Sequence, residues 1–310
     1  MMTVPFLKKF RTRFVDRPLP NAVFELAPGR LCGIRVSARG RPARKRFILP
    51  LETGALGPSF DRPNVISAGS VKRVIEEGMK VLGLGGGTIS LIIPETCVRI
   101  FILTVDSVPS GPGERDAFVR WRVGKLMPLL PEDLRLDYDF SAGPGPRKII
   151  VAAAREAIIR EYEDLFQSSG MKVGTVTIPS LSLVNFLDGG PDTNTILLNI
   201  EADNLSFLAV TDSGWTLYRQ KGVGLDLPAE EKADLVVNEV ENTVHFLEDK
   251  ERMKVERVRV RSESWEEGPL VVARLAESLA LPADMIDYPA PEEWDLREKA
   301  ILAPLVGQIS

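Results

Sequence analysis

Three short, mainly apolar stretches separated by polar and turn-forming residues lie near the start of the chain, which predicts a β-meander. Proline and glycine residues between the stretches favour turns. The predicted strands are 22–26, 31–36 and 46–51. Helical spacing then begins at Ser70, the expected N-cap, and runs to Leu82, before an apolar strand at Thr88–Ile93. This part of the chain is typical of an α/β protein.

The same order of elements returns in the second half of the chain. Strands are predicted at 195–200, 205–211 and 215–220, a helix at 234–248, a strand at 254–261 and a helix at 270–279. The segments Phe24–Gly40 and Leu198–Gly214 align without a gap, so that Glu25 corresponds to Asn199. The alignment predicts a duplicated α/β protein with two lobes and a cleft between them.

Between the two halves the pattern changes. It predicts strands at 98–105, 134–140 and 148–153 and helices at 114–127 and 155–168. We expect these elements to form a small α/β subdomain inserted into the first lobe. The expected boundaries are 20–94 for the first lobe, 95–170 for the insert, 171–190 for a return to the first lobe, 191–290 for the second lobe and 291–310 for a C-terminal segment.

Composition narrows the possible functions. The chain has 310 residues, 44% of them hydrophobic, which is enough for a large core. The 39 basic and 43 acidic residues leave no general positive field, so nucleic acid is not an expected partner. No apolar run is long enough to cross a bilayer. Cys32 and Cys97 lie in apolar runs and are expected as buried free thiols. With His245 as the single histidine, a histidine-based triad or metal site is not expected.

Two attractive motifs have simpler interpretations. Gly83–Thr88 resembles a nucleotide-binding loop, but such a loop follows a strand and opens a helix, whereas here the order is reversed. We expect a connector. Asp137 and Asp139 lie on one face of a predicted strand and could act as paired acids, although a solvated strand face is the simpler expectation.

Several segments resemble a known family. They occur in the expected order between residues 22 and 307, and they are Leu91–Pro94, Trp121–Pro128, Leu136–Asp139, Ile149–Arg155, Ser169–Val173 and Leu275–Pro282. Together with the duplicated meander, they resemble the type IV pilus assembly protein PilM of the actin-like superfamily. The cytoplasmic part of the type II secretion protein GspL would fit nearly as well. The resemblance implies a two-lobed, actin-like (ribonuclease H-like) fold with an inserted subdomain, as in FtsA, and here with a reduced lid on the second lobe.

The resemblance also implies partners. PilM-like proteins hold the cytoplasmic tail of a bitopic inner-membrane protein, PilN, in a groove between the first lobe and the insert, and connect it to the pilus motor ATPase and the platform protein. The chain would then be a cytoplasmic scaffold, attached to the inner membrane through partners, with self-association left open. The candidate groove residues are Val98, Ile100, Ile102, Phe118 and Trp121. Trp121 could anchor the peptide, but a place in the core is the simpler expectation for this residue.

The nucleotide site of actin-like ATPases is altered here. In the family, two hairpin turns wrap the phosphates of ATP. The matching positions are Glu25, Ala27 and Gly29 in the first turn, Asn199, Glu201 and Asp203 in the second, and Ser262 at the place of the adenine-binding glycine pair. Pro28 removes an amide donor, and Glu201 puts a carboxylate where phosphate should lie. Two like charges at 4 Å cost about 4 kcal/mol at an effective dielectric of 20. We therefore expect a pseudo-ATPase without a cofactor. The alternative is an active MgATP-binding protein in which Glu25 and Glu201 surround magnesium.

Overall fold

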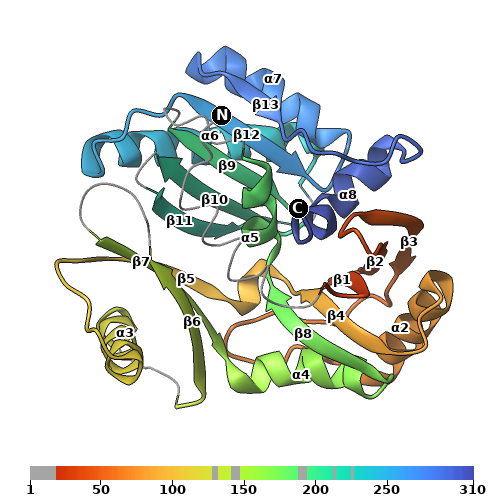
Figure 1. The fold of residues 1–310 in the computed structure, drawn as a ribbon. Coiled ribbons are helices and arrows are strands. Elements are labelled where there is room, and N and C mark those ends of the chain that lie inside the picture. Colours follow the sequence, from red (N-terminus) through yellow and green to blue (C-terminus); the bar gives the residue numbers. More distant parts are fainter. Residues whose placement is uncertain (1–18, 128–131, 141–146, 188–193, 212–213, 225–226) are drawn as a thin grey trace.

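A computed structural model describes residues 19–127, 132–140, 147–187, 194–211, 214–224 and 227–310 (Figure 1). Each half of the chain forms a five-stranded sheet, and a third sheet of three strands lies beside them. None of the described helices is long and apolar enough to cross a membrane.

The two large sheets have the same topology. The first has the order β3-β2-β1-β4-β8 and the second β11-β10-β9-β12-β13. In each, an antiparallel meander is followed by two strands that pair in parallel. The register matches too, because Leu26 pairs with Leu31 in one sheet and Ile200 with Leu205 in the other. The predicted duplication is confirmed.

The strands of the first sheet are β1 (Ala22–Ala27), β2 (Arg30–Val36), β3 (Pro42–Pro50), β4 (Gly87–Ile92) and β8 (Met171–Thr177). Those of the second are β9 (Thr195–Ile200), β10 (Asn204–Thr211), β11 (Gly214–Gly222), β12 (Arg257–Ser262) and β13 (Ala283–Met285). The pattern predicted most of these strands within one to four residues, but it did not predict β8 or β13.

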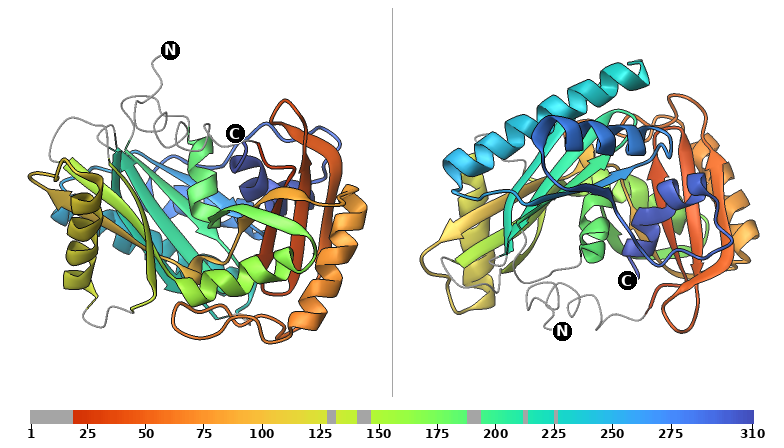
Figure 2. Two further views of the ribbon diagram at one scale, coloured as in Figure 1. Left: turned by 60° about the horizontal axis from the view of Figure 1, so that its bottom comes forward. Right: turned by 90° about the horizontal axis from the view of Figure 1, so that it is seen from above.

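Helices cover both faces of the first sheet (Figures 1 and 2). On one face, α2 (Ala68–Leu82) and α4 (Glu156–Gln167) bury Ile75 and Phe166 against Phe24. On the other face, α8 (Leu296–Gly307) packs with the cluster that contains Cys32. The second sheet packs against α6 (Ala229–Lys250) and α7 (Glu267–Leu279). The short helices η1 (Glu95–Cys97), α5 (Pro179–Leu183) and η2 (Val184–Phe186) lie near the junction of the lobes.

The insert consists of β5 (Arg99–Val105), α3 (Pro112–Leu126), β6 (Leu134–Phe140) and β7 (Arg147–Arg155). Its antiparallel sheet has the order β5-β7-β6. Val119 and Val123 of α3 pack on one face of this sheet, which leaves the other face toward the two lobes (Figure 1).

Some expectations need correction. Helix α4 falls within the range 95–170 expected for the insert, yet its buried side packs in the core of the first lobe, where Phe166 and Phe24 are in edge contact at 5.2 Å. Ser70 is not the N-cap, because the amide of Val71 already donates to the carbonyl of Ser67 and the helix begins at Ala68.

The C-terminal helix α8 was not predicted by the sequence pattern. A capping box begins it, with Asp295 accepting from the amide of Glu298 and the Glu298 side chain accepting from the amide of Asp295. Its apolar residues fill the space between the first sheet and the second lobe. Trp294 and the second half of α8, Ile301–Gly307, are therefore buried in the core.

The structure also shows where the two cysteines, the glycine cluster and the single histidine lie. Cys32 and Cys97 are buried free thiols, and burial raises the pKa of each to about 12. The glycines after Leu82 connect α2 to β4, with Gly83 in the left-handed conformation that ends the helix. His245 is exposed on α6.

Candidate functional site

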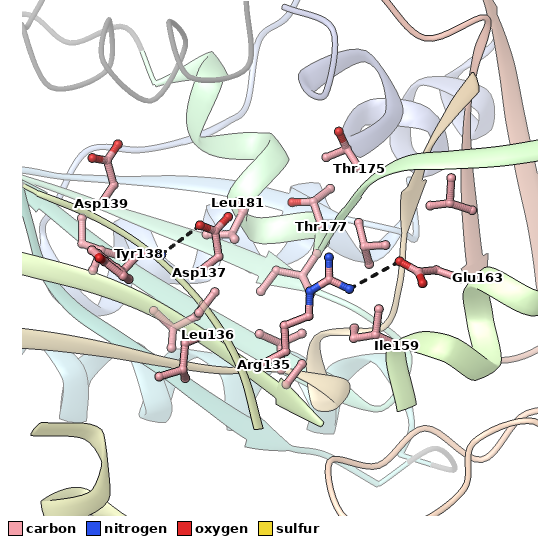
Figure 3. A pocket seen from close by; sticks show the side chains of 18 of the residues that line it. Arg135, Leu136, Asp137, Tyr138, Asp139, Ile159, Glu163, Thr175, Thr177 and Leu181 are labelled. Carbon is pink, nitrogen blue, oxygen red and sulfur yellow. Dashed lines mark hydrogen bonds and ion pairs between the residues drawn. The ribbon is translucent and has the colours of Figure 1, made fainter. Parts of the chain in front are cut away.

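A groove of about 410 Å³ lies where the insert meets the first lobe (Figure 3). One wall is the segment Arg135–Asp139 of β6, and the opposite wall is Val173–Thr177 of β8. The floor is apolar and comes from β5, β7, α4 and the segment around α5. Its residues are Val98, Ile100, Ile150, Ala152, Ala154, Ile159, Ile178 and Leu181.

Both walls are the edges of sheets. Side chains alternate between the two faces of a strand, so a strand whose consecutive residues all line a cavity presents its edge to it. Strand β6 is the last in the sheet β5-β7-β6, and β8 is the last in the sheet β3-β2-β1-β4-β8. The groove thus separates the terminal strands of two different sheets.

Charged side chains surround the apolar floor. Nη1 of Arg135 on β6 lies 3.5 Å from a carboxylate oxygen of Glu163 on α4, and this ion pair joins the insert to the first lobe (Figure 3). Asp137 and Asp139 extend from the same strand, and each accepts a hydrogen bond from the amide that follows it in the chain. The groove combines an apolar floor with a mainly acidic rim.

The predicted groove residues are divided between two faces of the insert. Val98 and Ile100 line the groove. Ile102 packs instead with the cluster of buried residues between the lobes. Phe118 and Trp121 belong to α3, on the opposite face of the insert sheet, and Trp121 is 56% exposed with Lys125 over its ring. The expected place of Trp121 in the core is wrong, because α3 buries Val119 and Val123 instead.

A second concentration of polar side chains lies between the two large sheets. Glu25 lies in the second half of β1, Arg30 opens β2, and Glu263 follows β12. Nη2 of Arg30 lies 3.0 Å from Glu25 and Nη1 lies 2.5 Å from Glu263, so one guanidinium bridges the lobes. Burial alone would lower the pKa of Arg30, but the two carboxylates outweigh it and raise that pKa.

The second hairpin position carries a buried acid. Glu201 is only 9% exposed, and burial together with the nearby charge of Glu95 raises its pKa well above the ordinary value. Its backbone carbonyl accepts from Nζ of Lys232 at 3.1 Å, and that lysine also pairs with Glu267. The pKa of Asp203 is raised as well, mainly by burial.

The third of the expected nucleotide-site positions, Ser262, lies next to Arg261, which contacts α8. Arg261, 2% exposed, donates to the side-chain oxygen of Asn199 at 3.0 Å and to the carbonyls of Ala300 and Ile301 of α8. Ser262 is buried, and its hydroxyl accepts from the amide of Ser264. Arg30, Arg261 and α8 were not predicted as parts of a site. The capping box was the local signal in the sequence that could have revealed the helix.

The residues at the three expected nucleotide-site positions do not fit a nucleoside triphosphate. Ala27 and Gly29 lie in a tight turn whose Gly29 has a φ of 77°, as a phosphate loop requires, but Pro28 between them has no N–H to offer. The cation nearest the turn, Arg30, is already held by Glu25 and Glu263. Glu25 Oε2, Arg30 Nε and Asn199 Nδ2 are buried without a hydrogen-bond partner in the described part of the chain.

No protein-family model matches the sequence, and no curated protein is significantly similar to it. Solved structures are similar. One is described as the PilM-PilN type IV pilus biogenesis complex; it is 15% identical in sequence, with a TM-score of 0.78 over 94% of this chain and 98% of that chain. Another is a protein of unknown function with an actin-like ATPase fold from Bacteroides thetaiotaomicron VPI-5482, 9% identical, with a TM-score of 0.54 over 93% and 97%. The chain therefore has the actin-like fold, in a form similar to that of the PilM-PilN complex.

Proposed function

We propose that this chain is a scaffold of a type IV pilus or type II secretion assembly at the cytoplasmic face of the inner membrane. It binds the extended cytoplasmic tail of a bitopic, PilN-like membrane protein in the groove between β6 and β8. It does so without hydrolysing ATP. Contacts with a pilus motor ATPase or a platform protein, and self-association, would complete this role.

The groove is the observation that carries this proposal. Its apolar floor and two strand edges suit an extended peptide, which can add to an edge through backbone hydrogen bonds and place alternate side chains on the floor. A similar structure is described as a complex of PilM with PilN, which supports a peptide partner of this kind.

The state of the interlobe cleft supports the second part of the proposal. In a functioning site, positive groups and bare amides would face the phosphates. Here Arg30 is neutralised by two carboxylates and Glu201 is buried in the same cleft. Arg30 with its two carboxylates bridges the lobes, and these side chains oppose the entry of a polyanion.

Calorimetry on the full chain tests the proposal. The titrant is the N-terminal cytoplasmic peptide of the bitopic membrane protein encoded beside this chain. We expect binding to the natural protein and its loss in Ala152→Phe, because the larger side chain fills the groove floor. The matched control is Ala117→Phe on the exposed side of α3, which leaves the groove unchanged. Absence of binding at high-micromolar peptide, or equal binding to both variants, contradicts the proposal.

A further inference from the structure

We propose that the groove selects a peptide strand with basic side chains, and that Asp137 and Asp139 of β6 are the residues that read this charge. This inference rests on the proposed function and adds the chemistry of the partner. The occupant is an extended segment that carries lysine or arginine and apolar side chains on the same face.

The groove walls carry more negative than positive side chains. They carry one cation, Arg135, and three carboxylates, Asp137, Asp139 and Glu163. Arg135 lies within 3.7 Å of both Glu163 and Glu156, so it is engaged by acids of α4. Within the described part of the chain, Asp137 and Asp139 have no ion-pair partner. Two negative charges therefore face the groove uncompensated (Figure 3).

Both carboxylates accept hydrogen bonds from backbone amides of their own strand. Oδ1 of Asp137 accepts from the amide of Tyr138 at 3.0 Å, and Oδ1 of Asp139 accepts from the amide of Phe140 at 2.8 Å. Amides two residues apart in a strand point to the same side. These two belong to the last strand of the insert sheet. The aspartates thus accept hydrogen bonds from backbone amides on a sheet edge. Charged side chains on an edge strand oppose pairing with strands of other proteins.

A strand that adds to β6 competes with the aspartates for these amides. Each displaced carboxylate then lacks a partner at the exposed rim of the groove. A lysine or arginine on the incoming strand provides that partner through a charge-assisted hydrogen bond. An acidic peptide would instead bring like charges together.

One face of an added strand can meet both requirements. Successive side chains of the strand point to opposite faces of the sheet. Asp137 lies opposite Ala152 and Asp139 opposite Ile150, so the acids and the apolar floor share one face. The side chains directed to that face therefore include both basic groups that reach the aspartates and apolar groups that reach the floor. Cytoplasmic segments beside a membrane-spanning helix carry an excess of lysine and arginine, so the tail of a bitopic protein has the required charge.

A phage-displayed library of random peptides, selected on the full chain, tests this inference without assuming a partner. Groove-dependent binders are those lost in Ala152→Phe and kept in Ala117→Phe. We expect the positions on one face of the bound strand, which are every second residue, to be enriched in lysine, arginine and apolar residues. Replacing both basic residues of a selected peptide by glutamine should weaken its binding by about three- to tenfold, and raising the salt concentration should weaken the original peptide.

The double variant Asp137→Asn/Asp139→Asn should lose the same factor and no longer distinguish the basic peptide from its glutamine form. Asp106→Asn, an exposed change on the same subdomain, is the matched control. Groove-dependent binders without a preference for basic residues, or with equal affinity for the double variant, overturn the inference and leave the proposed function standing. A selection with no groove-dependent binder overturns the proposed function itself. The glutamine peptides keep the test valid if the double variant folds poorly.

Discussion

Nη1 of Arg30 in the first lobe lies 2.5 Å from Oε2 of Glu263 in the second. The same guanidinium holds Glu25, at the position where the family resemblance places a magnesium-site acid. The cleft therefore contains its own cation, supplied by the chain. This arrangement joins the two lobes through an ion-pair bridge made of the chain's own side chains.

Arg30→Met should destabilise the protein by about 3–5 kcal/mol, because it leaves Glu25, 1% exposed, as a buried carboxylate without its ion-pair partner. Urea unfolding of the two proteins measures the difference. Arg160→Met is the control, since that solvent-exposed pair with Glu156 contributes little to stability. Equal losses in the two variants would show that the bridge between the lobes is not a stabilising feature.

MgATP should leave the melting temperature unchanged. A ligand at a hundredfold excess over its dissociation constant stabilises a protein by about 2.7 kcal/mol, which a thermal-shift assay readily detects. A clear shift that disappears in Glu25→Ala would contradict this account and support the MgATP-binding alternative, in which Glu25 and Glu201 surround magnesium.

Glu201→Gln should stabilise the protein near neutral pH. Burial raises the pKa of Glu201 in the folded state above its unfolded value. The folded protein then binds the proton more tightly than the unfolded chain, so this contribution to stability is complete below the unfolded pKa and is lost as the pH rises through the folded pKa. Glutamine imitates the protonated form and removes that loss, about 1.4 kcal/mol for each unit of pKa difference.

Unfolding free energies measured from pH 4 to pH 8 check this prediction. The variant and the natural protein should be similarly stable at the acid end, and the variant should gain over the natural protein as the pH rises. A gain that is equal at every pH, or a loss at pH 8, would show that Glu201 is stabilised as a carboxylate.

Gly307→Ala should destabilise the protein by about 1–3 kcal/mol through overpacking. A Cβ at Gly307 would lie 2.4 Å from the backbone oxygen of Ser182, so α8 would have to move away from α5. Gly113→Ala on α3 meets nothing within 4 Å and is the control. Unchanged stability in Gly307→Ala would mean that the contact of α8 with α5 is looser than described.

Local pattern predicted the repeated meanders because each strand is a short, mainly apolar run and most of the turns contain glycine or proline. It did not predict α8, whose acid- and proline-rich approach and internal Pro304 hide the helical spacing. The capping box of Asp295 and Glu298 was nonetheless readable in the sequence.

The sites were less predictable than the fold. The apolar residues of β5 are evident in the sequence, but the strand order that puts β6 at the groove is a tertiary property. Sequence alone could not pair Arg30 with Glu263, because 233 residues separate them along the chain. The prediction that Trp121 lies in the core rested on its large apolar side chain. Its exposure depends instead on which side of α3 faces the insert sheet.

Hydrogen–deuterium exchange with the partner's cytoplasmic peptide tests the groove most directly. The account predicts slower exchange for the amides of Arg135–Phe140 when the peptide is added, because an added strand takes up the donors of that edge. It predicts no change for the turns at 25–30 and 199–204 in the interlobe cleft. Protection confined to the cleft or to α3, with β6 unchanged, would contradict the account.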